Sequence, residues 1–127
     1  WTGSSWSSKT AVQVTTNSSP TIVTGSGVQV NTSTVTRVCM TATGRSNTST
    51  GYASFRIEGM FKREAGNVVA IGSPITTIIG QENDGTSTSF VFGVMNPDTI
   101  YGILIGNAAV QFNWATTIEW QTVSTSA

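Results

Sequence analysis

The sequence predicts an all-β fold, and two observations support this prediction. Residues 110–122 alternate between apolar and polar side chains, with Phe112, Trp114 and Ile118 on one parity. A period of two over such a run is typical of a β-strand with one buried and one solvated face. Turn-forming residues also recur about every 8–12 positions, and no segment has the 3.6-residue period of a helix. Together these features predict an antiparallel, jelly-roll-like β-sandwich of about 8–10 short strands.

The first half of the chain contains short predicted strands separated by turns. Asn, Ser, Pro and Gly at 17–20 and 25–27 favour a change of direction. A polar stretch at 44–51, which is bounded by glycines, predicts a surface loop. The Ser-rich residues 1–10 predict an N-terminal arm or linker, followed by a single sandwich domain at 11–127. The strands are expected at 11–16, 21–24, 28–31 and 34–43.

The second half has clearer strand signals. Residues 52–63 alternate, which directs Phe55 and Ile57 inward and Arg56 and Glu58 outward. The residues that follow, EAGN at 64–67, predict a hairpin turn. Strands are expected at 52–63, 68–71, 75–79, 88–95, 99–105 and 110–122, with turns at 72–74, 81–85, 96–98 and 106–107.

The last predicted strand is unusually long. At about 3.3 Å per residue it would extend roughly 40 Å. We therefore expect a bend or bulge near Ala115 and Thr116.

The charge balance argues against two classes of function. Six basic residues offset six acidic ones, and charged residues make up only 9% of the chain, against about 25% in an ordinary globular protein. Such a chain lacks the basic footprint of a nucleic-acid binder. No basic amphipathic helix or long apolar run predicts membrane insertion. Serine and threonine, about three residues in ten, supply the polarity.

The titratable residues predict no cofactor and no metal site. The chain has no histidine, which removes the commonest general base and metal ligand. Cys39 is the only cysteine, so no internal disulfide can form. Its position in an alternating strand predicts a packed small hydrophobe, with a reactive thiol or an intersubunit bridge as alternatives.

Three carboxylates occupy predicted turns. Glu82 and Asp84 share one turn, and Asp98 lies in another. Such groups could perform acid–base chemistry on a sugar or bind Ca²⁺. However, Asp and its neighbours Asn and Gly also populate turns for conformational reasons alone. We therefore predict no catalytic residue.

Two groups of residues are candidates for contacts with other molecules. Arg56, Glu58 and Lys62 share one strand face and form a solvated charge cluster or an intersubunit seam. Aromatic rings in or near loops or strand ends can stack on a sugar or on a neighbouring subunit. The candidate aromatic residues are Trp1, Trp6, Tyr52, Tyr101 and Trp120.

Residues 51–123 carry a resemblance. The stretches are GYASFRIEG at 51–59, FKREAG at 61–66, VVAIGSP at 68–74, ILIGN at 103–107 and FNWATTIE at 112–119. This order resembles a module near the C-termini of tailed-bacteriophage tail fibre, spike and related virion structural proteins. Phe90 stands where that module commonly has a tryptophan. The resemblance implies an exposed β-sandwich module, usually in a homotrimer, with no catalytic residue to carry over.

The leading hypothesis is a non-enzymatic virion structural protein, the tip or terminal module of a tail fibre or spike. It would be extracellular, bind other virion proteins, and contact host-surface polysaccharide. A capsid decoration (cement) protein of the same fold is one alternative, and a carbohydrate-binding module of a secreted enzyme or adhesin is another. A small glycosidase would require two carboxylates within about 5–10 Å of each other, drawn from Glu58, Glu82, Asp84, Asp98 and Glu119.

Overall fold

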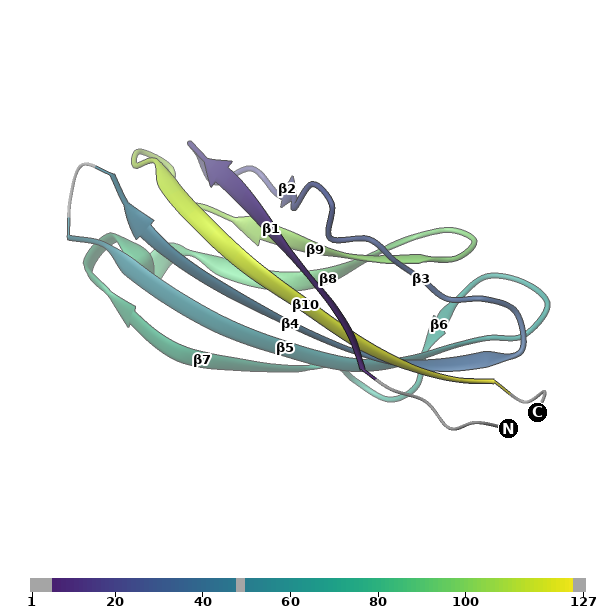
Figure 1. Cartoon of the computed structure of the whole chain (residues 1–127). Coiled ribbons are helices and arrows are strands. Elements are labelled where there is room, and N and C mark those ends of the chain that lie inside the picture. Colours follow the sequence, from purple (N-terminus) through teal and green to yellow (C-terminus); the bar gives the residue numbers. More distant parts are fainter. Residues whose placement is uncertain (1–5, 48–49, 125–127) are drawn as a thin grey trace.

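The computed structural model describes residues 6–47 and 50–124, and within them the all-β prediction is confirmed (Figure 1). Two antiparallel sheets stack on each other as a β-sandwich. The larger sheet contains β1 (Ser7–Thr15), β4 (Thr34–Ser46), β5 (Tyr52–Arg63), β6 (Val69–Ala70), β7 (Ile75–Glu82) and β10 (Phe112–Ser124). The smaller sheet contains β2 (Thr21–Ile22), β3 (Val28–Gln29), β8 (Ser89–Met95) and β9 (Thr99–Ile105), and a short 3-10 helix, η1 (Asn83–Ser87), joins β7 to β8.

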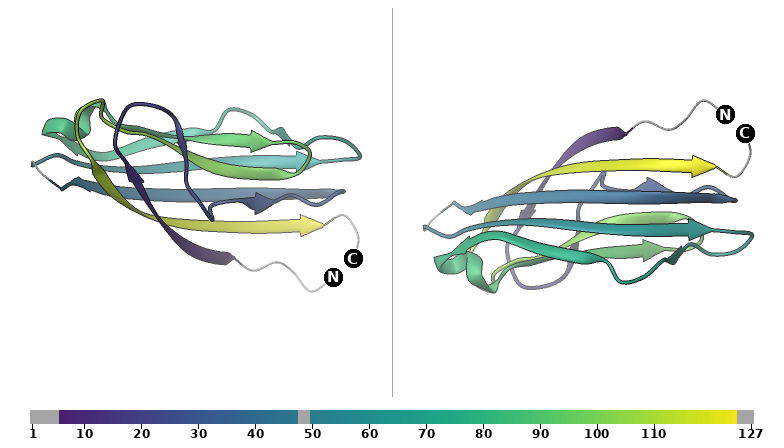
Figure 2. Two further views of the ribbon diagram at one scale, coloured as in Figure 1. Left: turned by 90° about the horizontal axis from the view of Figure 1, so that it is seen from above. Right: turned by 90° about the horizontal axis from the view of Figure 1, so that it is seen from below.

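The larger sheet has the order β1-β10-β4-β5, and both β6 and β7 pair with the far side of β5. β1 and β7 therefore form opposite edges of the sheet, as Figure 2 shows. Ser7 at the start of β1 lies opposite Trp120 near the end of β10. The start of β1 and the end of β10 are thus at the same end of the sandwich.

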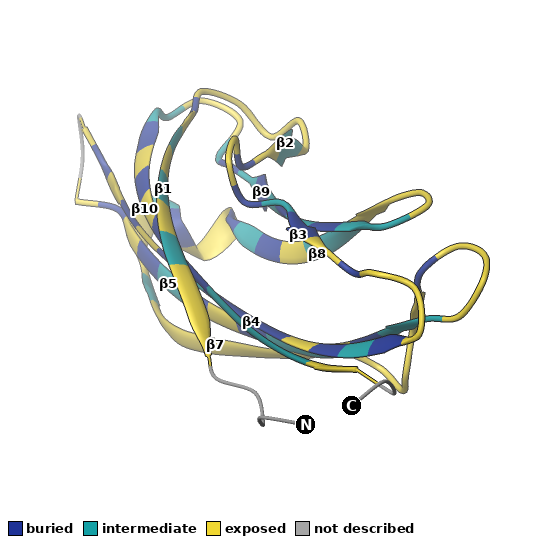
Figure 3. Ribbon diagram, turned by 45° about the vertical axis from the view of Figure 1, so that its right-hand side comes forward, coloured by how far each residue is buried: buried dark blue, intermediate teal, exposed yellow. Residues whose placement is uncertain are grey.

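The smaller sheet covers only one face of the larger one (Figure 3). β9 is its central strand, with β8 along one side and the short strands β2 and β3 along the other. The inner faces of the two sheets enclose the core. Phe61 of the larger sheet meets Phe92 of the smaller one edge to face, with ring centroids 5.3 Å apart, a favourable aromatic geometry.

Trp114 is the largest fully buried side chain of the core. Its ring lies between those of Phe55 and Phe112, with centroids 6.3 Å and 5.5 Å away. Space for the indole exists because its register partner on β4 is Gly44. A Cβ at that position would lie 2.3 Å from Cε3 of the indole.

Several sequence-based boundaries differ from the structure. β1 begins at Ser7, so residues 7–10 of the predicted arm belong to the sheet, where they pair with β10. The predicted loop at 44–51 is shorter, because β4 continues to Ser46. The predicted turn at 81–85 is instead the end of β7 followed by η1. Strand pairing extends each of these segments beyond its local turn signals.

The predicted bulge near Ala115 and Thr116 is wrong. β10 keeps an unbroken register with both of its neighbours, β1 and β4, from Phe112 onward. β1 pairs with Phe112–Trp120 and β4 with Phe112–Ser124, and β10 curves gradually along its length without a break in this pairing (Figure 2). The register shift of the larger sheet lies instead between β5 and the edge strand β7, at Ser54 and Phe55.

Candidate functional site on the outer face of the larger sheet

The face of the larger sheet that points away from the smaller sheet, here called the outer face, is the candidate site. It is formed by alternate residues of β1, β10, β4, β5 and β7, such as Thr43, Ser54 and Asn113. These three side chains are short and polar, and no other described element packs over this face. The outer face is therefore open to a ligand or a partner.

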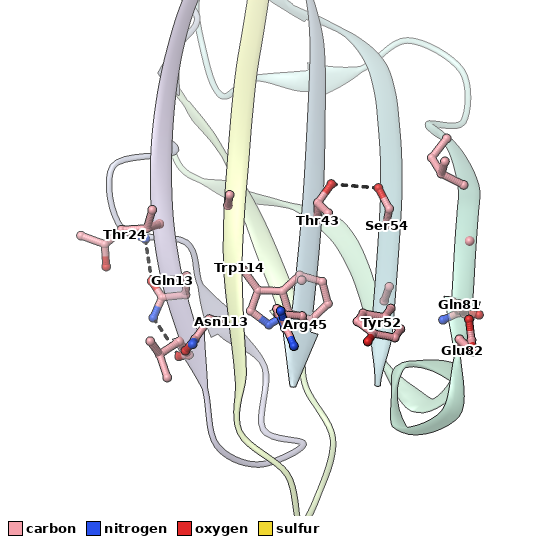
Figure 4. Close-up of a pocket in the computed structure, with 17 residues that line it drawn as sticks. Gln13, Thr24, Thr43, Arg45, Tyr52, Ser54, Gln81, Glu82, Asn113 and Trp114 are labelled. Atoms are coloured by element: carbon pink, nitrogen blue, oxygen red, sulfur yellow. Dashed lines mark hydrogen bonds between the residues drawn. The ribbon is translucent and has the colours of Figure 1, made fainter. Parts of the chain in front are cut away.

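A groove of about 1160 Å³ crosses one half of the outer face (Figure 4). This feature is the outer groove. Its floor consists of small side chains, among them Thr43, Ser54 and Ala115. Val12 from β1 stands at one side and Ile79 from β7 at the other. The groove thus has a floor of small side chains and aliphatic margins.

One end of the outer groove carries an aromatic residue and a cation. The guanidinium of Arg45 lies 5.9 Å from the ring centroid of Tyr52, within the range of a cation–π contact. Tyr52 is 42% exposed. Among the candidate aromatic residues that the structure describes, Tyr52 alone lines this groove.

The middle of the outer face holds a charge cluster. Arg37 Nη2 donates a 2.6 Å hydrogen bond to Glu58 Oε2, and Arg56 Nε donates a 3.1 Å bond to Glu58 Oε1. The hydrogen bond from Arg37 is the largest of the effects that hold the pKa of Glu58 below its ordinary value. Two residues of the predicted seam, Arg56 and Glu58, are thus brought together, whereas Lys62 lies on the same strand outside these ion pairs.

Cys39 lies beneath this cluster. Its register partners are Glu58 on β5 and Glu119 on β10, and its parity is that of the outer face. The residue is nonetheless only 3% exposed, and burial raises the pKa of its thiol. The prediction that Cys39 is packed is confirmed, although the packing is supplied by long polar side chains and not by the core.

The candidate aromatic residues do not converge on one platform. Trp6 is exposed, and its ring lies 5.3 Å from the guanidinium carbon of Arg37. Trp120 packs against the core with Lys9 5.5 Å from its ring. Tyr101 lies on β9 of the smaller sheet. Trp1 falls outside the described residues.

The carboxylates also lie apart. Asp98 accepts hydrogen bonds from Gln29 and Thr99, which lower its pKa, while Glu82 and Asp84 lie at the β7–η1 junction. Among the described residues no group of three potential ligands is placed to hold a metal ion.

The carboxylates of Glu58 and Glu119 lie on strands separated by β4. A general acid of a glycosidase needs a raised pKa. The pKa of Glu58 is shifted in the opposite direction.

The exposed aliphatic residues at the two edges of the larger sheet were not predicted as candidate site residues from the sequence. Ile75, Ile78 and Ile79 on β7 are 63%, 57% and 62% exposed, and Val12 on β1 is 78% exposed. A second, smaller hollow of the outer face is lined by Met60, Ile71 and Ile75, among others. The run ITTII at 75–79 indicates such an exposed apolar edge, because it contains no charged residue and lacks the alternation of a half-buried strand.

Comparisons with known proteins identify the fold. No protein-family model matches the chain, and no curated protein matches it. The structure is similar to the tailspike protein of Acinetobacter baumannii phage AM24, with a TM-score of 0.56 and 11% sequence identity over 96% of this chain. The chain spans 27% of the length of that protein. The fold is therefore related to a part of a phage tailspike.

Two further tailspikes give weaker matches. One is gp49 of Acinetobacter baumannii bacteriophage Fri1, a capsular polysaccharide depolymerase, with a TM-score of 0.42, 9% identity, 92% of this chain covered and 18% of that chain. The other is the tailspike of Acinetobacter phage vB_ApiP_P1, with a TM-score of 0.35, 12% identity, 94% of this chain covered and 21% of that chain. No helix among the described residues is long and apolar enough to cross a membrane.

Proposed function

We propose that this chain is a non-enzymatic structural module of a phage tail fibre or tailspike, placed at or near the terminus of the virion protein. The observation that carries the proposal is the similarity of its fold, over 96% of the chain, to the tailspike of phage AM24. Three copies of the module assemble as a homotrimer within the fibre or spike. It supports attachment of the virion to polysaccharide on the host surface.

The chemistry of the described residues favours a structural role. Glu58 is bound by two guanidinium groups, and Asp98 is engaged by Gln29 and Thr99. Both contacts stabilise the ionised carboxylate. These paired carboxylates fit a module that contributes assembly and binding. The hydrolytic chemistry would then belong to other parts of the virion protein.

Contact with host glycan is assigned to exposed aromatic and polar side chains. Tyr52 and Arg45 at one end of the outer groove are one such pair, and Trp6 beside Arg37 is another. Aromatic faces stack on sugar rings, and guanidinium groups bind acidic sugars. Tyr101 and Trp120 are more buried and have less surface to offer.

The test combines three measurements on the purified chain. Light scattering should give a trimer. The fluorescently labelled chain should bind encapsulated Acinetobacter baumannii cells, or other encapsulated bacteria in a panel, and not their capsule-deficient derivatives. Incubation with the purified capsular polysaccharide of a bound strain should release no reducing ends. Release of reducing ends would contradict the non-enzymatic role, and equal binding to cells with and without capsule would contradict the glycan role.

A further inference from the structure

We propose that the two edges of the larger sheet associate with each other, so that the β7 edge of one copy packs against the β1 edge of the next. The β7 edge is defined here by Ile75 and Ile79, and the β1 edge by Val12 and Val14. This inference rests on the trimer of the proposed function and specifies how its subunits meet.

The two edges carry the most exposed aliphatic side chains of the larger sheet. Val12 is the most exposed large hydrophobic residue of the described chain, and Val14 beside it is 48% exposed. On the opposite edge Ile75 and Ile79 are both more than half exposed. Grouped aliphatic residues of this kind mark surfaces that another molecule covers.

Both edges also lack two of the features that keep edge strands apart, charge and proline, although a register shift opposite Ser54 and Phe55 interrupts the pairing of β7. Charged side chains, prolines and bulged strands usually protect a sheet edge from pairing with another chain. Residues 75–81 of β7 and 10–15 of β1 contain no charge and no proline. Lys9 of β1 donates its hydrogen bond to the carbonyl of Gly27, so its charge is directed towards the smaller sheet and away from the free edge.

A second copy of this chain fits the two aliphatic edges better than a charged or saccharide ligand. Identical copies do not repel each other here, because both edges are neutral and the two guanidinium groups near Glu58 are already paired with it. A sugar platform needs exposed aromatic faces, whereas the margins of the outer groove are aliphatic. The small floor residues Thr43, Ser54 and Ala115 leave room for side chains that project from a neighbour.

The direction of the strands sets the symmetry of the contact. β10, β4 and β5 lie between β1 and β7, and every pairing is antiparallel, so β1 and β7 run in the same direction. A rotation axis along the strands preserves that direction and brings β7 of one copy beside β1 of the next. Because the two edges differ, the contact is heterologous, and it closes into a ring when the rotation between copies is a whole fraction of a turn, here one third.

Charge substitution at the two edges tests the contact. We expect Val12→Lys and Ile79→Lys each to reduce the mass in light scattering from a trimer towards the 13.3 kDa of one chain. Their circular dichroism should stay unchanged, since both positions are open to solvent in the single chain. The control Val91→Lys lies on β8 of the smaller sheet, is 39% exposed, and should remain a trimer. Trimeric Val12→Lys and Ile79→Lys variants would overturn the proposed contact and leave the trimer itself intact.

Disulfide cross-linking tests the heterologous geometry in a Cys39→Ala background. A chain with both Val12→Cys and Ile79→Cys should give covalent dimers and trimers on oxidation, whereas each single variant should stay uncross-linked. Efficient cross-linking of either single variant would show a symmetric contact and overturn the proposed one. A wild-type chain that is monomeric at all concentrations would refute both this contact and the trimer of the proposed function, with glycan binding still to be decided separately.

Discussion

The indole nitrogen of Trp114 donates a 2.9 Å hydrogen bond to Oγ1 of Thr15 on the edge strand β1. Both residues are 2% exposed, so the bond connects two residues far apart in sequence inside the core. A buried N–H needs such a partner, because leaving it unpaired costs its full desolvation penalty. The threonine thus allows a tryptophan to fill the sandwich where a purely apolar neighbour would not.

The substitution Thr15→Val should destabilise the fold by about 1–3 kcal/mol, since valine keeps the shape and leaves the indole N–H unpaired. Urea denaturation followed by tryptophan fluorescence measures the change. Thr10→Val on the exposed face of the same strand is the matched control, with an expected change within about 0.5 kcal/mol. Equal effects of the two variants would mean that the hydrogen bond contributes nothing measurable.

Gly44→Ala should lower the stability by about 1–3 kcal/mol or more, because the added Cβ would overlap the indole of Trp114. Gly66→Ala is the control, since a Cβ there meets nothing within 4 Å. In thermal unfolding, the combination of Gly44→Ala with Trp114→Phe should cost less than the sum of the two single changes. Additive losses would argue against direct crowding between the two positions.

Glu58 should make part of the stability dependent on acid. Its pKa in the folded chain is lowered from the ordinary 4.5, first by the hydrogen bond from Arg37. Its contribution is therefore present above pH 4.5 and is lost as the pH falls through the lowered folded-state value. The difference in unfolding free energy between wild type and Glu58→Gln should accordingly shrink between pH 6 and pH 3. Arg37→Gln should reproduce part of this change, and a pH-independent difference would exclude the ion pair as its cause.

The thiol of Cys39 should react slowly in the folded chain. Burial limits access to it and raises its pKa, and the thiolate is the reactive form. We expect modification by a chromogenic disulfide reagent to be about tenfold or more slower than at a new cysteine on the exposed outer face, Thr43→Cys in a Cys39→Ala chain. Comparable rates in the two chains would show that the charge cluster opens readily.

The alternating segments were predictable because burial itself imposes their period. Residues 52–63 and 112–122 place Phe55, Ile57, Trp114 and Ile118 in the core as their parity requires. The predicted bulge in β10 was wrong because length alone does not force an irregularity into a strand that is paired on both sides around that position.

The site was less predictable because it depends on register and on sheet order. Arg56 and Glu58 could be placed on one face from their spacing, but the partnership with Arg37 requires knowing how β4 aligns with β5. The exposure of Ile75, Ile78 and Ile79 follows from β7 being an edge strand. A local pattern of apolar residues does not distinguish an edge from an interior strand.

The pairing of Ser7 with Trp120 has a practical consequence for protein engineering. Segments fused before β1 or after β10 would both be attached at one end of the sandwich. The opposite end carries η1, where Asn107 donates hydrogen bonds to Asp84 and Ser87. A foreign epitope grafted between β9 and β10, at exposed Ala108 and Ala109, would be displayed on the side of the domain far from any carrier.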